Sequence, residues 1–223
     1  MAAGTESRVT VANVTAGTGV GEASHCQINM AQPAFYNLRH KRAQALGNHP
    51  PIAIENDGVT ALQIGEFYVD PAKKKVYLAT GLAANLSTAA DVAMPVLEVL
   101  LHANGLSGHS FSNIHFMHAT WLQPSGALGY VEQQSGSIHS FNGSAEATPG
   151  NIQLTRCSSL VFSGCSFRHL GAIAMTLSGG SHGNTVDDCL FEDVSAAAVQ
   201  IGGCVTSMTN LRVQIGIQSS SAS

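Results

Sequence analysis

The chain has 223 residues, of which only 11% are charged, and its formal net charge is −4 at pH 7. So few charges argue against a disordered chain and against a coiled coil. The excess of 14 acidic over 10 basic residues argues against a nucleic-acid-binding surface. No apolar run approaches the roughly 18 residues of a membrane span. The length predicts one domain with a small accessory part.

Residues 1–50 show weak hydrophobic periodicity and are predicted to form an irregular, partly stranded segment. Met1 is followed by AAGTESRVTV, which has neither the basic nor the apolar region of a secretory signal peptide. The glycines of AGTGVG (16–21) suggest a phosphate-binding loop, but the Lys-Ser/Thr ending of such a loop is absent. We therefore predict no cofactor.

Residues 51–93 are predicted to contain a β-hairpin. EFYVD and KVYLA are rich in aromatic and β-branched residues, and the DPAK turn between them has proline at a favoured position. Three lysines follow the turn, where they protect a strand edge from pairing. MPVLEVLL (94–101) is predicted to be an apolar strand at the start of the region 94–223, leading into its first turn.

A repeat with a period of 24 residues lies in the region 94–223. LVFSGCSFRHLGAIAMTLSGG (160–180) aligns with NTVDDCLFEDVSAAAVQIGG (184–203), so that Cys165 meets Cys189 and Phe167 meets Phe191. Within each unit the apolar residues alternate, which is typical of strands. This period, with glycines between the strands, favours a parallel β-helix whose turns share one core over an antiparallel β-sandwich.

A fainter copy precedes these two. SNIHFMHATW (112–121) places Phe116 51 residues before Phe167, which is close to two periods. The stretch 122–150 is rich in Gly and Ser and carries two prolines. We predict that it is mainly a long loop, with a strand at 137–141.

Three segments, IAIENDGVTALQIGEFYVDPAKKKVYLATG, ADVAMPVLEVLL and FSNIHFMHATWLQPSGALGYVEQQSG, resemble the right-handed parallel β-helix repeat proteins of the pectate-lyase-like superfamily. The resemblance extends over about residues 27–203. It implies an all-β fold, with a right-handed parallel β-helix and a small N-terminal part that contains the β-hairpin. It also implies an association with carbohydrate and an extracellular setting. Members usually continue for more turns, so we expect a truncated member.

Four acidic residues occupy seven positions near the end of the repeat: Asp187, Asp188, Glu192 and Asp193. The resemblance implies glycoside hydrolase or polysaccharide lyase activity, and glycoside hydrolysis needs two carboxyl groups about 5–9.5 Å apart. Asp187, Asp188 and Asp193 are therefore candidate catalytic residues, with a turn-capping role for Asp187 and Asp188 as the structural alternative. Hydrolysis is favoured over a lyase reaction because residues 76–223 contain only three basic side chains.

Two histidines fall into one column with an acid at the repeat spacing. His169 and Asp193 are 24 residues apart, and His118 follows Phe116 as His169 follows Phe167. A histidine beside a carboxylate suits acid–base chemistry, which makes His118 and His169 candidate catalytic residues. The alternative is a polar ladder that stabilises the sheet. No spacing of His or Cys residues indicates a metal site, and the five cysteines are predicted to be buried thiols.

The predicted loop region supplies candidates for sugar binding. Trp121, the only tryptophan, and Tyr130 can stack on sugar rings, although Trp121 is also suited to anchoring the core. Arg168 lies 24 residues before Glu192, which predicts an ion pair between stacked strands. The candidate substrate-binding residues are Trp121, Tyr130, Glu132, Gln134 and Arg168. The sequence thus predicts a polysaccharide-recognising or polysaccharide-processing protein, with a non-catalytic scaffold or adhesion module, or a truncated inactive relative, as the alternative.

Overall fold

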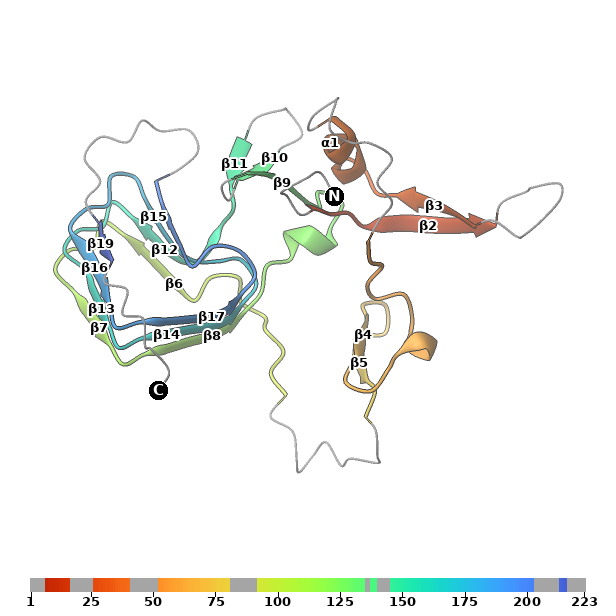
Figure 1. The fold of residues 1–223 in the computed structure, drawn as a ribbon, viewed down its shortest axis with the longest axis horizontal. Coiled ribbons are helices and arrows are strands. Elements are labelled where there is room, and N and C mark those ends of the chain that lie inside the picture. Colours follow the sequence, from red (N-terminus) through yellow and green to blue (C-terminus); the bar gives the residue numbers. More distant parts are fainter. Residues whose placement is uncertain are drawn as a thin grey trace, which may run out of the picture. The chain divides into compact units, whose positions relative to one another are not determined.

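Short alternating runs of apolar residues form β-strands, which make up most of the regular secondary structure of the described residues (Figure 1). The computed structural model describes residues 7–16, 26–40, 52–80, 92–134, 137–139, 145–202 and 213–215. Within these ranges there is one α-helix, α1 (Ala34–His40), and no helix has the length and apolar character needed to cross a membrane. The predicted all-β class is confirmed. The chain divides into two compact units, Asn48–Ala93 and residues 2–47 together with 94–223.

The smaller unit contains the predicted hairpin. Strands β4 (Phe67–Asp70) and β5 (Lys75–Leu78) pair antiparallel, with Phe67 opposite Leu78 and Asp70 opposite Lys75. Asp70 closes the turn because its Oδ1 accepts the backbone N–H of Lys73 at 3.0 Å and its Oδ2 lies 3.0 Å from Lys73 Nζ. The short 3-10 helix η1 (Val59–Ala61) precedes the hairpin.

Three sheets of parallel strands form the larger part of the other unit. The first contains β6 (Leu101–Asn104), β12 (Gly150–Thr155), β15 (Ile173–Ser178) and β18 (Val199–Ile201). The second contains β7 (Ser110–Ser112), β13 (Val161–Ser163), β16 (Asn184–Asp187) and β19 (Val213–Ile215). The third contains β8 (His115–Ala119), β14 (Ser166–Leu170) and β17 (Leu190–Val194).

The chain passes through the three sheets in turn and then repeats this path, leaving it between β8 and β12 for a separate group of strands described below (Figure 1). We call each such passage a circuit: β6, β7 and β8 form the first, β12, β13 and β14 the second, and β15, β16 and β17 the third. Phe167 of the second circuit pairs with Phe116 of the first and with Phe191 of the third. The register that the sequence predicts for these three phenylalanines is therefore confirmed.

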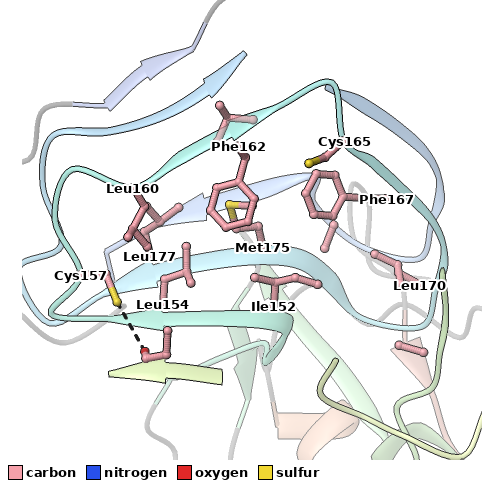
Figure 2. Packing of buried hydrophobic residues seen from close by; sticks show 14 residues of the cluster. Ile152, Leu154, Cys157, Leu160, Phe162, Cys165, Phe167, Leu170, Met175 and Leu177 are labelled. Atoms are coloured by element: carbon pink, nitrogen blue, oxygen red, sulfur yellow. Dashed lines mark hydrogen bonds between the residues drawn. The ribbon is translucent and has the colours of Figure 1, made fainter. Parts of the chain in front are cut away.

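The core lies between the sheets and is densest in the second circuit. Phe162 and Phe167 are completely buried, and Figure 2 shows them facing Met175 and Ile152 across the space between the strands. Rings at equivalent positions stack along the sheets, with centroids 5.2 Å apart between Phe116 and Phe167 and 4.7 Å between Phe167 and Phe191. Each circuit therefore buries its apolar face against the next one.

Left-handed backbone conformations recur at the same place in successive circuits. Asn113, Gly164 and Asp188 have φ angles of 55°, 63° and 48°, and each stands just after a strand of the second sheet. This conformation is open mainly to Gly, Asn, Asp and His. The chain turns sharply at this position in each circuit, and this requirement explains why the three equivalent residues are Asn, Gly and Asp.

Several strands lie where the sequence predicts little structure. The stretch 122–150, predicted as mainly a loop, contains β9 (Tyr130–Gln134), β10 (Ser137–His139) and β11 (Ala145–Ala147), which form an antiparallel sheet with β1 (Ser7–Arg8). The predicted strand at 137–141 is thus found only at its start, since residues 140–144 lie outside the described residues. Within 1–50, β2 (Val11–Ala16) and β3 (Cys26–Met30) form a second hairpin.

The apolar run 94–101 is not the strand that the sequence predicts. Residues 92–100 are irregular, and β6 begins only at Leu101. Pro95 cannot donate to a ladder, and the carbonyl of Leu97 instead accepts the backbone N–H of Thr120 at 2.9 Å. This irregular segment contributes to the hollow described next.

Candidate functional site

A hollow of about 490 Å³ opens beside Trp121. Its walls come from four parts of the chain: the irregular segment before β6, the residues at and after the end of β8, the residues around the start of β12, and Ala172 between β14 and β15. Its polar side chains belong to Glu98, Trp121, Gln123, Asn151 and Gln153, among others, and Val99, Leu122, Pro149 and Ala172 supply apolar surface. The hollow therefore combines one aromatic ring with amides and a carboxylate.

Asn151 of β12 connects its own segment to the other three parts. Its side chain is buried, and Nδ2 donates to the carbonyls of Glu98 at 2.6 Å and Thr120 at 3.1 Å. Its Oδ1 accepts the backbone N–H of Ala172 at 3.1 Å. A buried amide whose bonds are satisfied in this way fixes its surroundings. The wall of the hollow is therefore held by the scaffold.

Glu98 and Trp121 are positioned at the rim by local contacts. The backbone N–H of Leu122 donates to Oε1 of the exposed Glu98 at 2.8 Å. The half-buried Trp121 packs edge-on against Tyr130, with ring centroids 5.5 Å apart and an interplanar angle of 77°. The structure thus brings together two of the residues that the sequence selects for sugar binding.

Glu98, Gln123 and Gln153 are not among the site residues that the sequence predicts. Glu98 precedes the first strand of the parallel sheets, and Gln153 lies much further along the chain, in β12. Only the parallel pairing of β12 with β6 brings these segments side by side. No local pattern could reveal that contact.

The remaining loop candidates lie on β9. Tyr130 and Glu132 alternate along this strand and share one face, while Val131 on the other face is buried. Glu132 is half-buried, and the side chain of Gln134 lies outside the described residues. Tyr130 is the residue of this strand whose ring packs against Trp121.

The predicted histidine column is present at the end of the third sheet. The rings of His118 and His169 stack with centroids 5.0 Å apart, and His169 Nδ1 lies 2.7 Å from Asp193 Oδ2. All three residues have left-handed backbones, with φ angles of 59°, 53° and 51°. The His169 and Asp193 side chains are 47% and 73% exposed. Water therefore screens their interaction, and both a ladder and a proton-transfer role are compatible with this geometry.

The predicted ion pair between neighbouring strands is also present. Arg168 Nε lies 3.0 Å from Glu192 Oε2, with side chains 40% and 57% exposed. Arg168 does not line the hollow. It faces outward on the third sheet, so its predicted role in substrate binding belongs to a different surface from Trp121.

The three candidate catalytic carboxylates are distributed over two sheets. Asp187 ends β16 of the second sheet, Asp188 follows it at the turn, and Asp193 stands near the end of β17 in the third sheet. Asp188 lies before β17, and Asp193 stands three residues into that strand, which at about 3.3 Å per residue is about 10 Å beyond Leu190. The expected convergence of Asp193 with Asp187 or Asp188 is not found, because β17 extends between them.

Metal-ligating and thiol groups are scattered. In the ranges that the structure describes, no group of three or more His, Cys, Asp or Glu side chains is placed to hold a metal ion. Cys157 and Cys165 are buried, as predicted, whereas Cys26 is exposed. Burial raises the pKa of the Cys189 thiol. Cys204 lies outside the described residues.

Comparisons with models of protein families, with curated proteins and with solved structures find no match to this chain. In the part of the chain that the structure describes, the hollow beside Trp121 and the column of His118, His169 and Asp193 are the two arrangements considered for function. The hollow is enclosed by four segments of the chain, whereas the side chains of His169 and Asp193 are open to water.

Proposed function

We propose that this chain is a polysaccharide-recognising protein built on a right-handed parallel β-helix, and that it binds sugar in the hollow beside Trp121. The ordered circuits and the parallel pairing of Phe167 with Phe191 support the β-helix. Connections between parallel strands of one sheet are right-handed in about 98% of cases, which supports the hand. The resemblance to the pectate-lyase-like superfamily points to the same fold.

The observation that carries the function is the meeting of Trp121, Glu98 and two glutamines around one hollow. A sugar ring presents an apolar face that packs on an aromatic ring, and hydroxyls that bond to carboxylates and amides. A volume of about 490 Å³ lies within the usual range of about 300–1,000 Å³ for small-molecule sites. The open hollow suits a short stretch of a longer chain.

Recognition is better supported than hydrolysis. A glycosidase needs two carboxyl groups about 5–9.5 Å apart, and β17 separates Asp188 from Asp193. Asp193 is engaged by His169. Among the described residues, Glu98 is the only carboxylate that lines the hollow. Those residues therefore offer no carboxylate pair for acid–base catalysis at this site.

Affinity electrophoresis, which measures how strongly each of a panel of soluble polysaccharides retards the protein in a gel, tests the proposal. We expect Trp121→Ala to weaken the binding of any retarding polysaccharide at least tenfold, since stacking on the ring is lost. Phe67→Ala removes an exposed aromatic ring from the other unit and is the matched control. Thermal unfolding of both variants checks that they are folded, and Trp121→Phe, which keeps a ring, should restore part of the binding.

Equal binding by Trp121→Ala and the parent chain would contradict the proposal. Release of reducing ends from the same polysaccharides should be undetectable. If turnover occurs and is lost in Asp188→Asn or Asp193→Asn, the protein is a hydrolase that uses the acidic residues instead of the hollow.

A further inference from the structure

The side chains that line the hollow have unused hydrogen-bond acceptors. Gln123 and Gln153 each donate through Nε2 to a backbone carbonyl, of Gly129 at 3.3 Å and of Gly150 at 3.0 Å. Their Oε1 atoms have no hydrogen-bond partner among the described residues. Glu98 uses Oε1 to accept the N–H of Leu122, and its Oε2 has no partner in the same ranges. Three oxygens are thus left for a ligand.

The hollow is also asymmetric in charge. Within the part of the chain that the structure describes, Glu98 is its only ionisable side chain, and no Lys, Arg or His lines it. A primary ammonium carries three N–H donors and no acceptor, and its hydrogen bond to a carboxylate is about twice as strong as a bond between neutral groups. A uronate carboxylate has no donor when ionised and would meet a like charge. The site therefore fits a cation and disfavours an anion.

We infer that the hollow selects glycans with free amino groups, such as 2-amino-2-deoxy sugars, over neutral glycans and over uronic acids. This selectivity rests on the proposed function, because it concerns the same hollow. Trp121 supplies the stacking surface, and Oε2 of Glu98 receives the ammonium. The two glutamine oxygens accept from neighbouring hydroxyls or from the remaining ammonium hydrogens.

Calorimetry with four oligosaccharides of equal length and linkage tests this inference: an amino sugar, its N-acetylated form, the unsubstituted sugar and a uronate. At about pH 5.5 and low salt, we expect the amino form to bind about tenfold more tightly than the neutral forms, as one charge-assisted hydrogen bond allows. The uronate should bind most weakly. Added salt should reduce the preference, because salt screens exposed charges.

The Glu98→Gln variant tests whether the preference for amino sugars depends on the Glu98 carboxylate. The Gln carbonyl can still accept the N–H of Leu122, so the wall keeps its local bond while the charge is removed. We expect the ratio of affinities for the amino and unsubstituted sugars to fall to about one. Glu192→Gln removes the same charge from an exposed position outside the hollow and should leave the ratio at about ten.

The outcomes separate the two proposals. If none of the four oligosaccharides binds and no polysaccharide retards the protein, the proposed function fails and the selectivity fails with it. If neutral sugars bind through Trp121 but the amino form has no advantage, only the selectivity is overturned. A tenfold preference that survives in Glu98→Gln, or is lost in Glu192→Gln, also overturns it.

Discussion

His169 Nδ1 lies 2.7 Å from Asp193 Oδ2, and both residues hold the same left-handed backbone at equivalent places in neighbouring circuits. The contact arises from register, because the two residues are 24 positions apart in a parallel pair of strands. The backbone conformation favours Gly, Asn, Asp and His. Both residue types are therefore explained by the turn of the chain, without a catalytic role.

This explanation predicts a weak coupling between His169 and Asp193. Because both side chains are largely exposed, a double-mutant cycle with His169→Ala and Asp193→Ala should give a coupling free energy below about 1 kcal/mol. The coupling should decrease further with added salt. Chemical denaturation of the four chains provides the measurement. A coupling well above this limit would indicate a desolvated pair with a role beyond the ladder.

The stacked phenylalanines should differ in their contribution to stability. Phe167 is completely buried between Phe116 and Phe191, whereas Phe191 in the third circuit is only partly buried. We expect Phe167→Ala to lower the free energy of unfolding by about 3–5 kcal/mol, and Phe191→Ala by about half as much. Urea denaturation of both variants checks this. Equal losses would contradict the placement of Phe167 at the centre of the core.

Alanine substitutions at two glycines with left-handed backbones distinguish the cost of the backbone conformation from the cost of a steric clash. Gly108 has a φ of 70°, and an added Cβ there would have no atom within 4 Å, so Gly108→Ala should cost about 1 kcal/mol for the backbone alone. At Gly129, with a φ of 59°, an added Cβ would lie 2.6 Å from the carbonyl oxygen of Arg8 and 2.8 Å from Ala34 Cβ. Gly129→Ala should therefore cost about 2 kcal/mol more. Thermal unfolding compares the two, and equal costs would disprove the close approach of β1 to β9.

The turn of the β4–β5 hairpin should depend on pH. The backbone N–H and ammonium of Lys73 lower the pKa of Asp70 below its usual 3.8. The ionised carboxylate thus stabilises the turn above about pH 3.8, and this stabilisation is lost as the pH falls through the lower pKa of the folded state. NMR titration should show the Lys73 amide resonance moving below about pH 4. In Asp70→Asn this movement should be absent, and its persistence would place the titrating group elsewhere.

The sequence predicts best those parts of the fold that leave a pattern in the sequence itself, either an alternation of apolar residues or a repeated spacing. The hairpin at Phe67–Leu78 and the register of Phe167 with Phe191 follow from local alternation and from a repeated spacing. The pairing of Arg8 with Tyr130 joins residues more than a hundred positions apart in strands of a few residues. Such short strands have too few positions to show a period.

The residues of the candidate site likewise fall into those that the sequence can predict and those that it cannot. Trp121 and Tyr130 stand out by residue type, and the structure places their rings in contact. Glu98 stands in an irregular segment whose position depends on bonds to Asn151 and Leu122. Four acids close in sequence attract attention as a cluster, yet β17 keeps Asp188 and Asp193 apart. Proximity along an extended strand is a poor guide to proximity of side chains, because each residue adds about 3.3 Å.

The fluorescence of Trp121 tests the central claim most directly, since the chain contains a single tryptophan and that residue lines the hollow. Titration with a polysaccharide that binds in calorimetry should change the emission of Trp121 saturably, with the same dissociation constant in both measurements. A polysaccharide that binds in calorimetry without any change in this emission would contradict a binding site beside Trp121.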